Sequence, residues 1–262
     1  MEHTGRLTDI RNMNRVVFAL ILRDIRSRYF GNGLGFLAAA AWPLAHITVI
    51  LAIYTALGRT APYGEAPSLF FATGLAPVLS ALYISRFIMT SVLQNGMLLN
   101  FPAVHLLDII FARGVLEILG GILMTIVLIA ALYFAGVDVV PSDTIAAISG
   151  LAAALYLGFG MGVLNAVLAF KFKWWPLFYM LIYLVVYLTS GILFDASALP
   201  AKLKEIVVYN PALHVVEMVR GAYYPHYGRE LLDMKYPVGC ATAVLFLGLS
   251  IERIFRRQLQ SR

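Results

Sequence analysis

The sequence predicts an all-α membrane protein with six transmembrane helices, and two observations carry this prediction. Of the 262 residues, 61% are hydrophobic and only 13% are charged, whereas a soluble domain usually carries about 25% charged residues. The apolar residues also lie in long unbroken runs, and a helix needs roughly 20 of them to cross a membrane. A transmembrane β-barrel would show short alternating segments instead. We therefore expect one transmembrane domain over residues 1–262.

Residues 8–30 precede the first long apolar run and predict an amphipathic helix. Apolar side chains recur there at helical spacing, at Ile10, Met13, Val17, Leu20 and Ile21. Arginines crowd the other positions, which is typical of a helix that lies in the membrane interface. The alternative is an N-terminal helix that packs on a soluble partner.

The long apolar runs place the six spans at residues 34–57, 69–92, 114–135, 144–170, 176–194 and 237–254. Pro43 and Pro77 fall inside the first two spans, where neighbouring helices can satisfy the freed carbonyl groups. Residues 93–113 form a connector between the second and third spans. Residues 195–235 are more polar, and their two apolar patches are too short to cross a bilayer. That segment predicts short re-entrant helices before the last span.

The placement of lysine and arginine predicts the orientation. The N-terminal segment, the connector, the boundary at residues 171–173 and the C-terminal tail together carry 13 of the 20 basic residues. Most basic residues on the opposite side fall in the long 195–235 segment, whereas the short loops there carry only one. Because short cytoplasmic loops are rich in lysine and arginine, both termini are expected in the cytoplasm, in a bacterial inner membrane. The net charge of +6 thus follows membrane topology and does not indicate nucleic-acid binding.

The sequence carries no recognisable enzyme motif. It has no phosphate-binding glycine loop, no histidine pair at zinc spacing, and a single cysteine, Cys240. We expect no catalytic residue, metal or cofactor in this chain. Arg86 and Glu117 are ionisable residues near the ends of the second and third spans, where they either pair or reach the interface separately. Ion-coupled transporters need such groups deeper in the membrane, so any transport would draw its energy from another subunit.

Aromatic residues form a stripe along the fifth span. They recur every four residues, at Trp175, Tyr179, Tyr183 and Tyr187. This spacing keeps the side chains on one face of a helix. Tyrosine usually lies at the ends of a span, so Tyr183 in the middle needs a hydrogen-bonding partner or a polar cavity. The stripe predicts either a pathway for a sugar chain or a helix-packing surface. Phe70 and Phe71 are expected to extend it.

The 93–113 connector is short and partly apolar. A short helix in such a loop can dock in a groove of a soluble partner. The alternative is an ordinary loop that lies on the membrane.

Three stretches carry a family resemblance. The first runs from Arg23 to Phe36 (RDIRSRYFGNGLGF) and continues at Trp42–Pro43–Leu44. The second comprises Phe101–Pro102, Leu107–Asp108, Ala112–Arg113 and Leu116–Glu117. The third is Asn210 to Gly221 (NPALHVVEMVRG). In this order they resemble the permeases of ABC-2 polysaccharide exporters, most closely the capsular polysaccharide branch. The chain departs from that pattern at Asn32 and Gly33, near a frequent serine, and at Ala38–Ala41, which replace bulkier residues.

The resemblance implies an assembly and a substrate. Two permeases would form the pathway, and two copies of a separate soluble ABC ATPase would bind ATP and Mg²⁺. The substrate would be a lipid-linked capsular polysaccharide, handed on to periplasmic and outer-membrane export components. Three other functions stay open. The same architecture exports O-antigen or teichoic-type polymers, a related permease exports small lipids or drugs, and a scaffold or channel would need no ATPase.

The resemblance also implies roles for residues outside the aromatic stripe. The gate helix would include Arg23, Asp24, Arg28 and Tyr29. The coupling helix seated on the ATPase would include Leu99, Asn100, Phe101, Pro102, Val104 and His105. The re-entrant helices would lie on the periplasmic side and include Asn210, Pro211, His214, Glu217 and Arg220.

Overall fold

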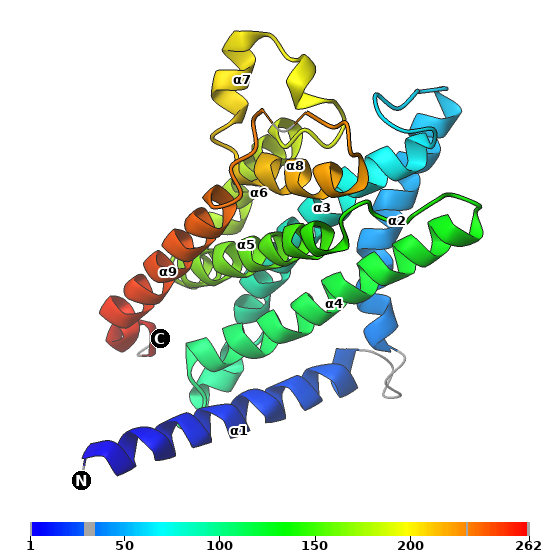
Figure 1. The fold of residues 1–262 in the computed structure, drawn as a ribbon. Coiled ribbons are helices and arrows are strands. Elements are labelled where there is room, and N and C mark those ends of the chain that lie inside the picture. The colour runs from blue at the N-terminus through cyan, green and yellow to red at the C-terminus, as the bar shows by residue number, and fades with distance from the viewer. Residues whose placement is uncertain (1, 29–34, 229, 261–262) are drawn as a thin grey trace.

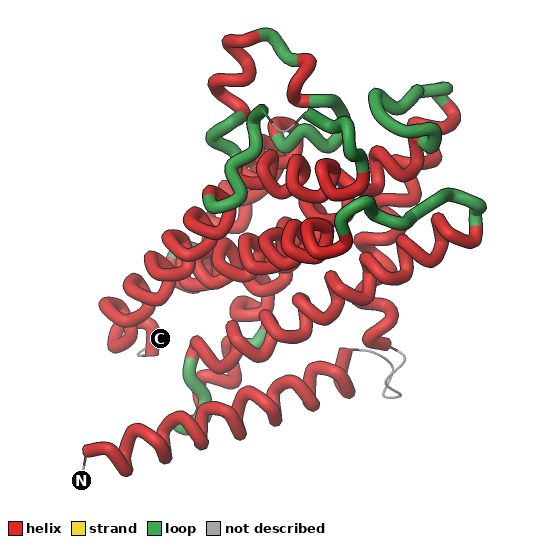
Figure 2. The backbone as a smooth tube through the Cα atoms, viewed as in Figure 1, coloured by secondary structure: helices red, strands yellow, loops and turns green. Residues whose placement is uncertain are grey.

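The computed structural model describes residues 2–28, 35–228 and 230–260, and all regular elements in these ranges are helical (Figures 1 and 2). The α-helices are α1 (Glu2–Arg28), α2 (Gly35–Ala56), α3 (Pro67–Gln94), α4 (Leu106–Phe134), α5 (Thr144–Lys171), α6 (Trp175–Thr189), α7 (Ala201–Val207), α8 (Pro211–Tyr223) and α9 (Tyr236–Gln260). Two 3₁₀ helices are η1 (Gly96–Asn100) and η2 (Ala196–Ala198).

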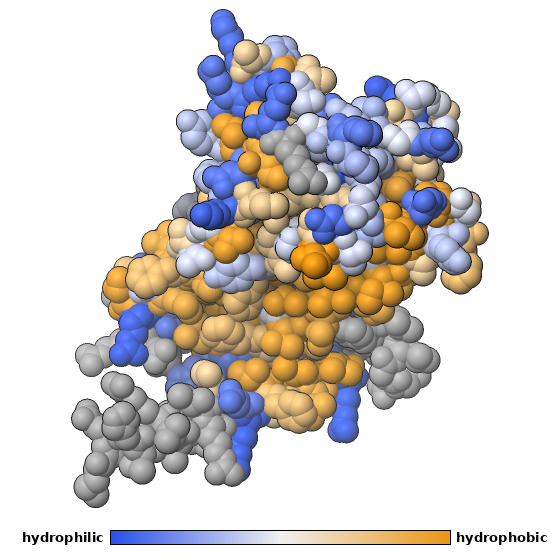
Figure 3. Space-filling model, viewed as in Figure 1, coloured by the Kyte–Doolittle hydropathy of each residue, from blue (hydrophilic) through white to orange (hydrophobic). Residues whose placement is uncertain are grey.

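Four helices are long and apolar enough to cross a membrane, namely α3, α4, α5 and α9. Two shorter apolar helices are α6 and the Ala41–Ala56 part of α2. The prediction of an all-helical membrane protein is therefore confirmed. Figure 3 agrees with it, because a hydrophobic band crosses the middle of the face in view and hydrophilic residues gather around α7.

Helix α1 lies along one end of the bundle, and α7 and α8 lie at the opposite end (Figure 1). We call these the α1 end and the α8 end. Helix α9 runs from the α8 end toward the other, so that the N and C marks lie on the same side of the picture. The two short helices α7 and α8 occupy the 195–235 segment, where the sequence predicted them.

The centre of the bundle is held by small residues on α5. A Cβ atom added to Gly158 would lie 2.5 Å from the carbonyl oxygen of Ala81 in α3. A Cβ atom added to Gly160 would lie 2.5 Å from the carbonyl oxygen of Ala241 in α9. Only glycine allows backbones to approach this closely, which is a common basis of helix packing in membranes. Helices α3, α5 and α9 therefore form a tight central unit.

Two helix boundaries differ from the prediction for a local reason. Helix α4 begins at Leu106, eight residues before the expected span at 114–135, because its N-terminus is capped. The backbone N–H of His105 donates to Oδ2 of Asp108 at 2.8 Å, which satisfies an otherwise free donor of the first turn. Helix α6 ends at Thr189 and not at 194, because Gly191 adopts a φ of +75° that turns the chain.

Candidate functional site: a cavity between three helices

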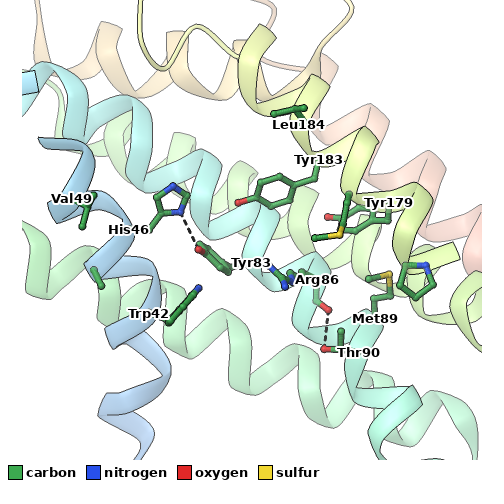
Figure 4. Close-up of a pocket in the computed structure, with 13 residues that line it drawn as sticks. Trp42, His46, Val49, Tyr83, Arg86, Met89, Thr90, Tyr179, Tyr183 and Leu184 are labelled. Atoms are coloured by element: carbon green, nitrogen blue, oxygen red, sulfur yellow. Dashed lines mark hydrogen bonds between the residues drawn. The ribbon is translucent and has the colours of Figure 1, made fainter. Parts of the chain in front are cut away.

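A cavity of about 750 Å³ lies between α2, α3 and α6 (Figure 4). Much of its lining is apolar, but each helix also contributes polar or aromatic side chains. Those that argue for a binding site are Trp42, His46, Tyr83, Arg86, Tyr179 and Tyr183. The lining thus combines ring faces, hydroxyl groups, an imidazole and one guanidinium, which together can bind a ligand that has both C–H faces and polar groups.

The tyrosine stripe of α6 forms one wall of the cavity and continues beyond it. Tyr183 and Tyr187 stack with their ring centroids 6.5 Å apart and their planes 9° apart. The His46 ring of α2 stacks on Tyr187 at 6.2 Å, and Nδ1 of His46 is 3.0 Å from the Tyr83 hydroxyl in α3. The four-residue spacing predicted a row of rings on α6 alone. In the structure this row also contacts α2 through His46, and His46 in turn contacts α3 through Tyr83.

The other end of the stripe packs into the bundle. Tyr179 is almost completely buried while also bordering the cavity. Trp175 donates from Nε1 to Oδ1 of Asn165 at 2.9 Å, and Asn165 donates in turn to Oγ of Ser85 at 3.0 Å. These bonds anchor the start of α6 to α5 and α3. Trp175 therefore packs within the bundle, whereas Tyr183 borders the cavity.

Phe70 and Phe71, which were expected to extend the stripe, are core residues in this structure. Both are buried in the first turns of α3 and do not line the cavity. The guanidinium of Arg220 lies 3.9 Å from the ring centroid of Phe70, and Tyr54 packs on Phe71 at 4.3 Å. The two rings serve the core because the α8 end covers this part of α3.

Glu117 pairs with Arg113 and not with Arg86. Nη2 of Arg113 lies 2.5 Å from Oε1 of Glu117, one helical turn away on α4. Nη1 of Arg113 is 3.9 Å from Oδ2 of Asp24 in α1. This leaves Arg86 at the cavity, where no ion pair or hydrogen bond joins its guanidinium to any residue that the structure describes.

The predicted gate helix is joined to the connector. Nη2 of Arg23 donates to Oδ1 of Asn95 at 2.6 Å and to Oδ1 of Asp24 at 2.7 Å. Asn95 directly precedes η1, so α1 contacts the start of the connector as well as α4. The side chain of Arg28 and the whole of Tyr29 lie outside the described residues.

The predicted coupling residues form a short protrusion at the α1 end. Leu99 and Asn100 end η1, and the chain then turns through Phe101 and Pro102 to His105. The side chain of Phe101 is 60% exposed, whereas Leu99 and Val104 are half-buried against the bundle. The protrusion therefore exposes the ring of Phe101, while Leu99 and Val104 pack against the bundle.

At the α8 end, the predicted re-entrant residues fix the geometry of α8. Pro211 is the first residue of α8, and Oδ1 of Asn210 caps the helix by accepting from the Ala212 N–H at 2.9 Å. Nδ2 of Asn210 donates to the Val186 carbonyl of α6 at 2.8 Å. Nδ1 of His214 accepts from the Asp233 N–H at 3.0 Å, so Nε2 carries the proton that bonds to the Val208 carbonyl at 2.8 Å.

Arg220 holds the irregular backbone that follows α6. It is fully buried, and its two terminal nitrogens donate to three carbonyl groups, those of Gly191 at 2.8 Å, Ile192 at 2.7 Å and Phe194 at 3.0 Å. Gly74 leaves room for the guanidinium, since a Cβ atom there would lie 2.8 Å from Nη2.

One turn earlier on α8, Glu217 accepts a hydrogen bond of 2.6 Å from the Tyr227 hydroxyl. Burial raises the pKa of the Glu217 carboxyl to about 7, although the Tyr227 hydrogen bond and the charge of Arg220 oppose the shift. The Glu217 carboxyl is therefore much less readily ionised than an exposed one.

Three residues of the cavity were missed at the sequence level, namely Trp42, His46 and Tyr83. His46 and Tyr83 are polar groups in the middle of apolar runs, and that contrast is a signal that could have found them. Trp42 carries no comparable signal, because tryptophan is common near the ends of membrane helices.

The chain matches known proteins over most of its length. The Escherichia coli protein named polysialic acid transport protein KpsM is 29% identical over 238 residues, which cover 90% of this chain and 92% of that protein. The Neisseria meningitidis capsule polysaccharide export inner-membrane protein CtrC is 29% identical over 250 residues, which cover 94% and 93%. The Haemophilus influenzae capsule polysaccharide export inner-membrane protein BexB is 25% identical over 247 residues. Residues 15–224 match the ABC-2 type transporter family, and the chain belongs to that family.

Proposed function

We propose that this chain is the permease subunit of an ATP-driven transporter that exports lipid-linked capsular polysaccharide across the inner membrane. The observation that carries the proposal is the cavity lined by Tyr83, Tyr179 and Tyr183 within a bundle of apolar helices. Sugar rings stack their C–H faces on aromatic rings, while hydroxyl and imidazole groups can bond to sugar hydroxyls. Family membership and the names of the relatives support the same function.

We count α2 and α6 as spans, which brings the total to six. Helix α2 has 22 residues and is about 33 Å long, enough for a hydrocarbon core of about 30 Å. Helix α6 has 15 residues and is only about 22 Å long. The rest of its path would be made by the backbone at Gly191–Phe194. Irregular backbone is tolerated at membrane depth only where protein satisfies its polar groups, and Arg220 does so here.

The distribution of basic residues supports a cytoplasmic α1 end, because short cytoplasmic segments are rich in lysine and arginine. The α8 end then faces the periplasm. A polymer would enter near α1 and leave near α8.

The exposed rim of the cavity supports a homodimer of the chain. Its outer rim is formed by exposed apolar side chains, including Val49 on α2 and Leu184 on α6. A homodimer that joins these rims would cover the apolar surface and turn two open cavities into one enclosed path. The stacked rings of Tyr183 and Tyr187 would then line that path or its edge.

The protrusion at the α1 end would bind the separate ATPase that supplies ATP hydrolysis and holds Mg²⁺. An exposed aromatic residue on a short helical turn suits a hydrophobic groove on a soluble partner. The bond from Arg23 to Asn95 would pass movement of this protrusion to α1.

The proposal is tested by introducing charge into the protrusion. We expect the double variant F101D/V104D to reduce surface polysaccharide at least tenfold, because two carboxylates would oppose docking in an apolar groove. ATP hydrolysis by the ATPase would no longer drive export. Ile206→Asp in α7 is the matched control, since it adds a carboxylate at an exposed apolar position at the other end of the molecule. Undiminished polysaccharide at normal permease levels would contradict the docking role.

A further inference from the structure

Arg86 is the one cation in the lining of the α2–α3–α6 cavity, and no acidic side chain lines that cavity within the described part of the chain. Its side chain lines the cavity together with Tyr83, Tyr179 and Tyr183 (Figure 4). Because Arg86 lies eight residues before the end of α3 at Gln94, its Cα is about 12 Å from that end of the helix.

Two other arginines in the bundle have partners for their guanidinium groups. Arg113 is paired with Glu117 and lies near Asp24, and Arg220 donates to three carbonyl groups. Among the described residues, Arg86 has neither kind of partner. An unpaired cation inside a membrane helix costs free energy and usually marks a substrate pathway. The charge of Arg86 is therefore available to a ligand in the cavity.

We infer that Arg86 binds an anionic group, a carboxylate or a phosphate, of the exported lipid-linked polymer, and so sets the preference of the cavity for a charged over an uncharged ligand. The inference rests on the proposed function and assigns a specificity-determining residue to it. A guanidinium forms two parallel hydrogen bonds with a carboxylate or a phosphate, and such charge-assisted bonds are stronger than neutral ones. Neighbouring tyrosine hydroxyls supply neutral bonds and ring faces, which suit the uncharged part of a sugar. The two sources of an anion are acidic sugars along the polymer and a phosphate that joins the polymer to its lipid.

The test measures binding to the permease–ATPase complex in phosphatidylcholine nanodiscs. One pair of probes is a galacturonate decamer and its methyl ester, in which a methyl group on each carboxyl removes the charge of the sugars. A second pair is dihexanoyl phosphatidylglycerol and dihexanoylglycerol, which differ in the phosphate headgroup. Wild type is expected to bind the charged member of at least one pair with a Kd roughly 10- to 100-fold lower. The pair that shows this preference identifies the source of the anion.

The variants separate Arg86 from a general effect of positive charge. Arg86→Gln should remove the preference, and Arg86→Lys should keep part of it, because lysine retains the charge without the planar fork. Lys173→Gln, which removes an exposed cation outside the cavity, should leave the preference unchanged. Equal thermal unfolding of the variants checks that each complex is intact.

Two results would overturn the inference. If Arg86→Gln keeps the wild-type preference in both pairs, Arg86 is not the anion site, and the proposed function is unaffected. If wild type binds the two members of each pair equally well, or binds none of the probes, the inference is also wrong, and the proposed function is tested separately by the export assay of F101D/V104D.

Discussion

The two ends of the bundle each bury an arginine, and they satisfy it in different ways. At the α1 end, Arg113 faces carboxylates from two helices, Glu117 of α4 and Asp24 of α1. At the α8 end, Arg220 faces three backbone carbonyls of a single irregular segment. A contact between side chains of separate helices can break and re-form as the helices move. Arg220, in contrast, is part of the fold, since without it the carbonyls lose their donors at once.

The largest effect is expected when the α8 end is broken. Arg220→Met keeps most of the side-chain volume but leaves three buried carbonyls without their donor, so the free energy of unfolding should fall by at least about 3 kcal/mol. Unfolding of the purified permease in mixed detergent micelles measures this. Lys202→Met, at an exposed position of α7, is the control and should change stability by less than about 0.5 kcal/mol. Equal stability of Arg220→Met and wild type would remove the structural role given to Arg220.

A smaller effect is expected at the α1 end. Glu117→Gln should lower the free energy of unfolding by about 2 kcal/mol, because Asp24 still offers Arg113 a partner at longer range. Combining it with Arg113→Met gives a sharper test, since the double variant no longer buries that cation. The double variant should lose about 1–3 kcal/mol less free energy of unfolding than the two single variants lose when their losses are added. Strict additivity in this double-mutant cycle would show that the pair is not coupled.

The smallest effect on stability is expected where α1 meets the connector. Asn95→Ala removes the bond to the partly exposed Arg23, so its cost should stay below about 1 kcal/mol. The expected change lies in coupling, because the ratio of polymer exported to ATP hydrolysed should drop several-fold. Asn14→Ala, at an exposed position of α1, should leave that ratio unchanged. An unchanged ratio in Asn95→Ala as well would mean that this contact transmits no movement.

The parts of the fold that depend on side-chain patterns could be predicted from the sequence. Apolar runs predicted the helices, short apolar patches predicted α7 and α8, and four-residue spacing predicted the row of rings on α6. The start of α4 could also have been predicted in principle, since Asp108 is an acidic residue of the kind favoured in the first turn of a helix.

The rest depended on contacts that the sequence does not display. The partners of Arg220 are backbone carbonyls. Every residue type has a backbone carbonyl, so the sequence does not show which carbonyls will accept a hydrogen bond from a side chain. Reasoning from depth in the membrane suggested Arg86 as a partner of Glu117, although Arg113 lay one turn away on the same helix. The sequence also does not show on which side of α3 Phe70 and Phe71 lie.

The glycine contacts of α5 have a consequence for how such a molecule can move. Gly158 and Gly160 set the backbone of α5 directly against those of α3 and α9, with no side chain between them that could change its rotamer. Helices locked in this way behave as a rigid frame, because sliding would drive a backbone into a backbone. The α6 wall of the cavity instead contacts α2 through side chains, since the ring of Tyr187 stacks on that of His46. We therefore expect the path to widen for a bulky polymer by movement of α6, while α3, α5 and α9 keep their positions relative to one another.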